Sequence, residues 1–390
     1  MSYVPPLTLV VTLQVHDHRL YMGAACSPPE GDRATRLQQL RHAVTRIEVL
    51  ESDLQACVRK LRDLDAAIEK QLIVSPRVDD ALQAQYRSTL DEVEAHLIEP
   101  ISRELAMHFW QHTLSLEHPA NPRHLMLLPD SFLWGLPLER FDCLLRLFGR
   151  ENHSALSRDL SLHLAAQRVA GVVEDPAGGE RKTVQTKVVG GARPETTALL
   201  TDTFNEDELH PSDNAKGDVL CAVHQRLVEA KVVGLAEPKS LHGKLFTVSP
   251  DDIKSTLADS SVCYSLGFGH FFNLISSSAF ASLDLRHVAF LGLFHRAMNS
   301  NAFRRQAKAE STKAASQVAF ENSYGLSLVA GFKGVQSTLL ATAPVPTVLS
   351  VRAFEAFARG FQGGSAAGKA LEDVLNTKIT NADLRYARTA

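Results

Sequence analysis

The fold class follows from the stretch Val262-Cys263-Tyr264-Ser265-Leu266-Gly267-Phe268 and from similar runs on either side of it. A short, continuous apolar run is typical of a strand that is buried on both faces of a sheet. Helical patterns separate these runs. Alternating strands and helices predict an α/β fold with a mostly parallel sheet flanked by helices. The other runs lie at residues 125–128, 232–235, 288–294 and 334–341.

The first hundred residues have a different pattern. Apolar residues alternate with polar ones at 7–15, which predicts a strand, and residues 20–25 are expected to return as its β-hairpin partner. From Arg33 to Leu72 the apolar spacing is near-heptad, which predicts one long helix. A second helix is expected from Val78 to Ile101, with Pro100 kinking or restarting it. The two helices should form a long antiparallel hairpin.

These patterns predict two domains. Residues 1–118 would hold the N-terminal strands and the helical hairpin, and residues 119–390 would form the α/β domain. Residues 172–218 are rich in Gly, Pro and charged residues, so we expect a long mobile insertion with one strand near 184–189. Further helices are expected at 348–359 and 365–376.

The composition excludes several function classes. The 390 residues carry 41 basic and 44 acidic side chains, so a net charge of −3 supplies no field for nucleic acid or an anionic membrane. Five scattered cysteines without a CxxC pair argue against a disulfide framework or a zinc site and favour a reducing compartment. No signal peptide or membrane helix is apparent. We therefore expect a cytoplasmic protein without cofactor or metal.

Several segments, taken in order, resemble the CHAT domains, which are caspase-like peptidases related to separase. Residues 127–139 (LLPDSFLWGLPLE) resemble the strand and turn that open this domain, and Ser157-Arg158-Asp159 falls where the family has a second short motif. The segment from Leu241-His242-Gly243 to Gly267-Phe268-Gly269-His270 is similar to the one that ends in the catalytic histidine. Residues 326–339 resemble a late helix–strand pair. The resemblance implies a caspase-like fold over residues 85–376.

The same resemblance implies that the catalytic dyad is degenerate. In this family the nucleophilic cysteine follows the histidine, at the end of the next core strand, because the thiolate needs a nearby base. The last cysteine here is Cys263, so no thiol lies between His270 and Ala390. Phe294 or a neighbour takes the place of the nucleophile. We expect a non-catalytic pseudo-peptidase, with His270 and Phe294 as remnants and Cys263 as a buried packing residue.

Residues 300–306, with Lys313 and Glu321, resemble the CHAT-like region of a large central-apparatus protein of motile cilia. This implies a docking module in a cytoskeletal hetero-complex, in the axoneme of a cilium or flagellum. The densest basic stretch supplies the binding candidates for an acidic partner such as a tubulin surface, and a solvated helix face is the alternative. These candidates are Arg304, Arg305, Lys308 and Lys313.

Two other functions stay open. The first is an active CHAT-type peptidase or hydrolase with an unusual nucleophile, such as a serine near His270. The second is a nucleotide-responsive switch, because residues 363–370 (GGSAAGKA) approach a P-loop, although Ala370 stands where the hydroxyl residue belongs. His16 with His18, and Cys221 with His224, have metal-ligand spacing, but neither pair has a visible third ligand.

Overall fold

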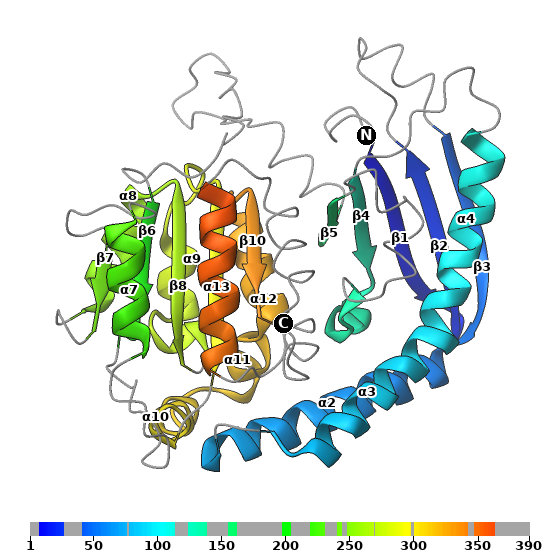
Figure 1. Cartoon of the computed structure of the whole chain (residues 1–390). Helices are drawn as coiled ribbons and strands as arrows, with labels where there is room; N and C mark the ends of the chain where they lie inside the picture. The colour runs from blue at the N-terminus through cyan, green and yellow to red at the C-terminus, as the bar shows by residue number, and fades with distance from the viewer. Residues whose placement is uncertain are drawn as a thin grey trace, which may run out of the picture. The chain divides into compact units, whose positions relative to one another are not determined.

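The computed structural model forms two compact units, residues 1–64 with 81–186 and residues 65–80 with 187–390. Within these units, the structure describes residues 8–26, 41–75, 78–113, 124–138, 155–161, 197–203, 219–230, 240–243, 248–268, 270–297, 300–341 and 347–362. Figure 1 shows that each unit is built around its own sheet.

The first sheet begins with the predicted hairpin, β1 (Thr8–His16) and β2 (Arg19–Cys26). The two strands pair in antiparallel register from Leu9 opposite Cys26 to His16 opposite Arg19. Asp17 and His18 form the turn, both with positive φ (47° and 58°), as a tight hairpin turn requires. The complete strand order is β3-β2-β1-β4-β5.

β4 (His124–Pro129) and β5 (Ala155–Arg158) extend this sheet in parallel with β1. The backbone N–H of Asp130, directly after β4, donates to the carbonyl of Leu13, 2.7 Å away. The segment that we compared with the opening of a CHAT domain is therefore hydrogen-bonded to the N-terminal strand. This pairing differs from the predicted division at residue 118, which would separate β1 from β4.

The helix predicted from Arg33 to Leu72 is wrong at residues Arg41–Leu50, which form the strand β3. Residues 33–40 lie outside the described residues. β3 pairs antiparallel with β2, with a register shift between Arg19 and Leu20. Its buried Ile47 and Val49 alternate with exposed Arg46 and Glu48. The spacing of Val44 and Ile47 also fits a helix face, so the apolar positions alone did not distinguish the two structures.

The predicted helical hairpin is present, beginning at residue 51. α2 (Glu51–Val74) and α3 (Asp80–Val93) run antiparallel, with Lys60 bound to Glu92 at 2.6 Å. α4 (Glu99–Thr113) continues α3 through a π-helical turn, η1 (Glu94–Ile98). Pro100 cannot donate a backbone hydrogen bond, and a π-turn directly before it accommodates this loss without ending the helix.

The second sheet is entirely parallel and has the order β10-β9-β8-β6-β7. Its strands are β6 (Thr197–Thr201), β7 (Ser240–His242), β8 (Val262–Phe268), β9 (Phe290–Ala297) and β10 (Ser337–Leu340). β6 lies inside the segment predicted as a mobile insertion, and all five of its residues are buried. Because both faces of β6 are covered, it lacks the alternation that marks a half-buried strand.

Helices cover both faces of this sheet, as predicted. On one face, α7 (Val219–Glu229) and α13 (Thr347–Gln362) pack over β6, β8 and β9. On the other face lie α8 (Pro250–Asp259), α9 (Ser277–Ser282), α12 (Ser323–Phe332) and the 3₁₀ turn η6 (Phe271–Asn273). Figure 1 shows α7 and α13 on one side and α12 on the other.

α10 (Ser300–Glu310) and α11 (Ala315–Phe320) connect β9 to α12. The strands predicted at 184–189 and 232–235, the helix at 365–376 and the glycine-rich segment 363–370 lie outside the described residues. Within the described part of the chain, no helix is both long and apolar enough to cross a bilayer.

Candidate functional site

The carboxyl edge of the second sheet is the natural place for a site. In open parallel sheets, ligands bind beyond the carboxyl ends of the strands, at the point where the strand order reverses. Here the reversal lies at β6 and β8, since β7 pairs on the outer side of β6. Asp202 and His270 follow these two strands, and His242 ends β7.

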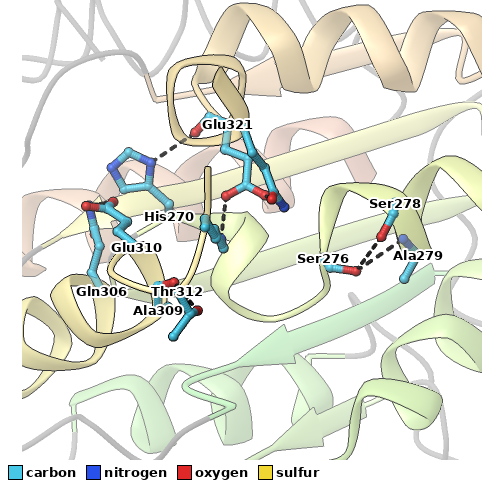
Figure 2. A network of polar contacts seen from close by, with 11 residues as sticks. His270, Ser276, Ser278, Ala279, Gln306, Ala309, Glu310, Thr312 and Glu321 are labelled. Atoms are coloured by element: carbon cyan, nitrogen blue, oxygen red, sulfur yellow. Dashed lines mark hydrogen bonds and ion pairs between the residues drawn. The ribbon is translucent and has the colours of Figure 1, made fainter. Parts of the chain in front are cut away.

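His270, the predicted remnant of the dyad, lies at this edge. It is the N-cap residue of η6 and is half-buried, while the next two residues, Phe271 and Phe272, are buried. Its Nδ1 atom lies 3.2 Å from the backbone carbonyl oxygen of Glu321 (Figure 2). The imidazole is thus held from both sides, by the turn that carries it and by the segment before α12.

The contact to Glu321 belongs to a larger network. The Glu321 carboxylate forms an ion pair with Lys313 and accepts a hydrogen bond from Gln317 Nε2 at 3.2 Å. The side chains of Lys313 and Glu321 are only 14% and 6% exposed. Lys313 was a binding candidate in the sequence, but its ammonium group is committed to this buried pair. The pair fixes the loop that presents the Glu321 carbonyl to His270.

A second histidine lies one strand away. His295 on β9 is 5% exposed, and its Nε2 atom is 2.7 Å from the Ser265 hydroxyl oxygen on β8. Burial, and to a lesser extent the nearby His270, lower the pKa of His295 to about 3, although the interaction of the ring with the backbone carbonyl of Phe268, as acceptor, opposes this. The imidazole is therefore neutral at physiological pH. Phe271 packs edge-on against it, with ring centroids 5.6 Å apart.

Phe294 does not occupy the strand end. β9 continues to Ala297, which pairs with Phe268, the last residue of β8. Phe294 instead points to the opposite face of the sheet, where its ring packs against Phe354 of α13 with centroids 4.9 Å apart. The position opposite the end of β8 is therefore an alanine, and Phe294 is a packing residue. β9 continues for three residues beyond Phe294, whereas we expected Phe294 to lie at the end of this strand.

Cys263 is also far from the edge. It is fully buried among residues of the α8, α9 and α12 side, and burial raises its pKa to about 12. The strand from position 263 to position 268 spans roughly 17 Å, so the thiol cannot reach His270. Cys57 lies on α2 and Cys221 on α7, and Cys143 is outside the described residues.

A buried polar cluster at the same edge was missed as a cluster by the sequence analysis. Thr201 Oγ1 lies 2.6 Å from His224 Nδ1, and the rings of His224 and His242 meet edge-on at 5.4 Å. Burial, assisted by His242, lowers the pKa of His224 to about 4. The spacing of Cys221 and His224 had suggested a metal pair, whereas His224 contacts residues far away in the sequence. No metal-ligand cluster of three or more residues occurs among the described side chains.

The remaining basic candidates lie on α10. Arg304, Arg305 and Lys308 are exposed, as is Phe303 at 45%. Arg304 and Lys308 are four residues apart and so share one face of the helix. His16 and His18 are exposed at the hairpin turn, where His18 pairs with Glu51 at 2.9 Å. The structure thus separates Lys313 from the other three basic candidates.

Comparison with solved structures identifies a similar fold. The chain matches the separase of the Saccharomyces cerevisiae separase–securin complex with a TM-score of 0.60 and 11% sequence identity. The fold is similar to the caspase-like fold of separase. The match covers 98% of this chain and 29% of the separase chain, so this chain spans less than a third of that protein's length. No family model and no curated protein matches the sequence.

The caspase-like likeness agrees with the fold class expected from the sequence. It concerns the backbone, because identity at this level carries no information about individual side chains. The carboxyl edge itself carries the half-buried His270, the buried Lys313–Glu321 ion pair and the cluster of Thr201, His224 and His242, while the Ser265–His295 pair lies inside the sheet.

Proposed function

We propose that this chain is a non-catalytic, caspase-like scaffold that serves as a docking module in a cytoskeletal assembly, namely the central apparatus of a cilium or flagellum. The observation that carries this proposal is that no cysteine lies at the position where a caspase-like peptidase has its nucleophile. In a caspase-like peptidase, the catalytic histidine follows one core strand and the nucleophilic thiolate lies beside it, at the end of the next core strand. Here no cysteine follows Cys263 in the sequence, and Cys263 is buried inside β8.

The rival function, a hydrolase with a serine nucleophile, has one specific observation in its favour. Ser265 and His295 are within hydrogen-bond distance, as a nucleophile and its base must be. Both residues are at most 5% exposed, however, and Phe271 covers the imidazole. A substrate carbonyl has no route to a hydroxyl group inside the sheet, so the pair supports packing rather than acyl transfer.

Docking is assigned to α10. Arg304 and Lys308 present two positive charges on one face, next to the exposed ring of Phe303. Exposed charges of one sign accelerate and orient association with a surface of the opposite sign. An acidic protein surface, such as that of a microtubule, fits this helix. The partners would be other axonemal proteins within a hetero-complex.

Co-sedimentation of the purified protein with stabilised microtubules tests the docking proposal. We expect Arg304→Glu with Lys308→Glu to weaken binding by about tenfold, with a smaller salt dependence. Arg59→Glu with Arg352→Glu is the matched control, because it reverses two exposed charges on other helices and should bind as the wild type does. Equal binding by the two double variants would remove α10 from the interface.

Location in the cell tests the assembly. A tagged copy in a flagellated cell should stay with the axoneme after detergent extraction and leave it at high salt. A tagged protein that extracts completely with detergent alone would contradict the cytoskeletal role.

A further inference from the structure

β3 is an end strand of the first sheet and presents an unusual exposed row. Within the described residues, β2 is the strand that pairs with it, and the sheet order ends at β3. Val44 and Leu50 are 74% and 45% exposed, which is high for large apolar side chains. Between them lie Arg46 and Glu48, with side chains 51% and 72% exposed. The row therefore reads apolar, positive, negative, apolar.

We propose that β3 pairs with β3 of a second copy of this chain, antiparallel, about a two-fold axis midway between the two opposed Ile47 residues. In an antiparallel pair, opposed residues lie on the same face and are close enough to interact. Around this axis Arg46 faces Glu48 of the second copy, and Glu48 faces its Arg46. Val44 faces Leu50 of the second copy in the same way. The two sheets then join into one continuous sheet.

The order of the side chains supports a second copy as the occupant. A two-fold interface uses the same patch twice, so the patch must be complementary to itself when reversed. The row meets this condition at both pairs of positions, since charge meets opposite charge and apolar meets apolar. The inner residues Ile47 and Val49 are buried in their own unit, so pairing along the edge leaves the core closed.

A contrasting interpretation is that the charges protect a bare edge. Natural edge strands often carry charged residues that discourage pairing with other chains. Such protection works best with like charges, which repel across an antiparallel pair. Here Arg46 and Glu48 have opposite signs and already bind each other at 2.6 Å along the strand. In the dimer the same groups are shared between the two strands, and Val44 and Leu50 become covered.

Charge reversal gives a sharp test, because the wild-type pair can be broken and then rebuilt. We expect the wild-type protein to sediment as a dimer at micromolar concentration. With Glu48→Arg, Arg46 of each copy faces an arginine of the other copy. With Arg46→Glu, Glu48 of each copy faces a glutamate of the other copy. Each single variant should dimerise about tenfold more weakly. Combining the two substitutions in one chain should restore the dimer.

Mixing the two single variants gives a second result that other modes of association do not produce. A chain with Glu48→Arg and a chain with Arg46→Glu are complementary at both positions, so the mixture should form heterodimers although neither variant dimerises well alone. Arg59→Glu, an exposed reversal on α2, should leave the wild-type dimer unchanged. A monomeric wild-type protein, a dimer that tolerates both single reversals, or a mixture that stays monomeric would each overturn the proposal.

Discussion

Ser265 Oγ and His295 Nε2 lie 2.7 Å apart on neighbouring strands of the second sheet, in a place that substrate cannot reach. Two strands that end at the same edge bring a hydroxyl group and an imidazole together with near-catalytic spacing. The side-chain period of a strand decides their role, because it turns both residues toward the α9 and α12 side. The pair therefore belongs to the core, whereas His270 lies at the edge.

The buried histidines should make stability depend on pH. The ordinary pKa of 6.5 falls to about 4 for His224 and about 3 for His295 in the folded chain. Between these values and 6.5 the unfolded chain binds more protons, so stability is complete above pH 6.5 and declines as the pH falls. At pH 5 each histidine should cost about 2 kcal/mol relative to pH 7.5. Urea unfolding at the two pH values measures the difference.

The control is a histidine variant. His224→Gln should make the loss between pH 7.5 and pH 5 smaller by about 2 kcal/mol, because one titrating group has been removed. A variant with the same pH dependence as the wild type would show that His224 is protonated in the folded state as readily as in the unfolded one.

The ion pair of Lys313 and Glu321 should be important for stability. Lys313→Met leaves the Glu321 carboxylate, 6% exposed, without its counter-charge, which should cost about 3 kcal/mol in urea unfolding at pH 7. Lys308→Met removes the same type of side chain from an exposed position on α10 and should change stability by less than about 0.5 kcal/mol. Equal effects of the two variants would mean that the pair is open to water.

Thiol reactivity should separate the cysteines. Cys263 is fully buried and burial raises its pKa to about 12, so iodoacetamide should leave it unmodified in the folded protein at pH 8. Cys221 is only partly buried and should be alkylated faster than Cys263. Mass spectrometry of the digested protein, with a denatured sample as the control, gives the rates. Alkylation of native Cys263 at the rate of Cys221 would contradict its place in the core.

Gly243 should tolerate no side chain. A Cβ atom there would collide with the backbone carbonyl of Asp202 and lie 2.8 Å from that of Thr203. Both clashes are with backbone, which cannot rotate away, so Gly243→Ala should cost about 2 kcal/mol or more. Gly135→Ala, where no atom lies within 4 Å of the added carbon, should cost less than about 1 kcal/mol. A harmless Gly243→Ala would show that this edge is looser than the structure has it.

The sequence was most informative where one signal was unambiguous. The apolar run at 262–268 matches β8, and alternation at 7–15 with polar residues at the turn matches the β1–β2 hairpin. β3 and β6 were missed for different reasons. In β3 the apolar residues fit two periods at once, and in β6 the strand is five residues long within a segment rich in glycine and proline.

The site could be predicted only in part. The order of motifs placed His270 at the end of a strand, because that position depends on local sequence. The contact partners of Lys313 and His224 are brought close by the tertiary fold and cannot be read from the sequence. The sequence showed Lys313 only as part of a basic cluster, and His224 only as paired with Cys221 at helical spacing. β9 pairs with β8 as far as Ala297, so the strand ends at Ala297 and not at Phe294, where the sequence led us to expect its end.

The most direct test of the claim that this chain lacks peptidase activity is a peptidase assay on the pure protein. The wild type and His270→Ala are incubated with a diverse peptide library and with electrophilic warheads that trap cysteine or serine nucleophiles, and the products are analysed by mass spectrometry. We predict no adduct at the carboxyl edge of the second sheet and identical peptide profiles for the two proteins. Sequence-selective cleavage by the wild type that is lost in His270→Ala would contradict the account.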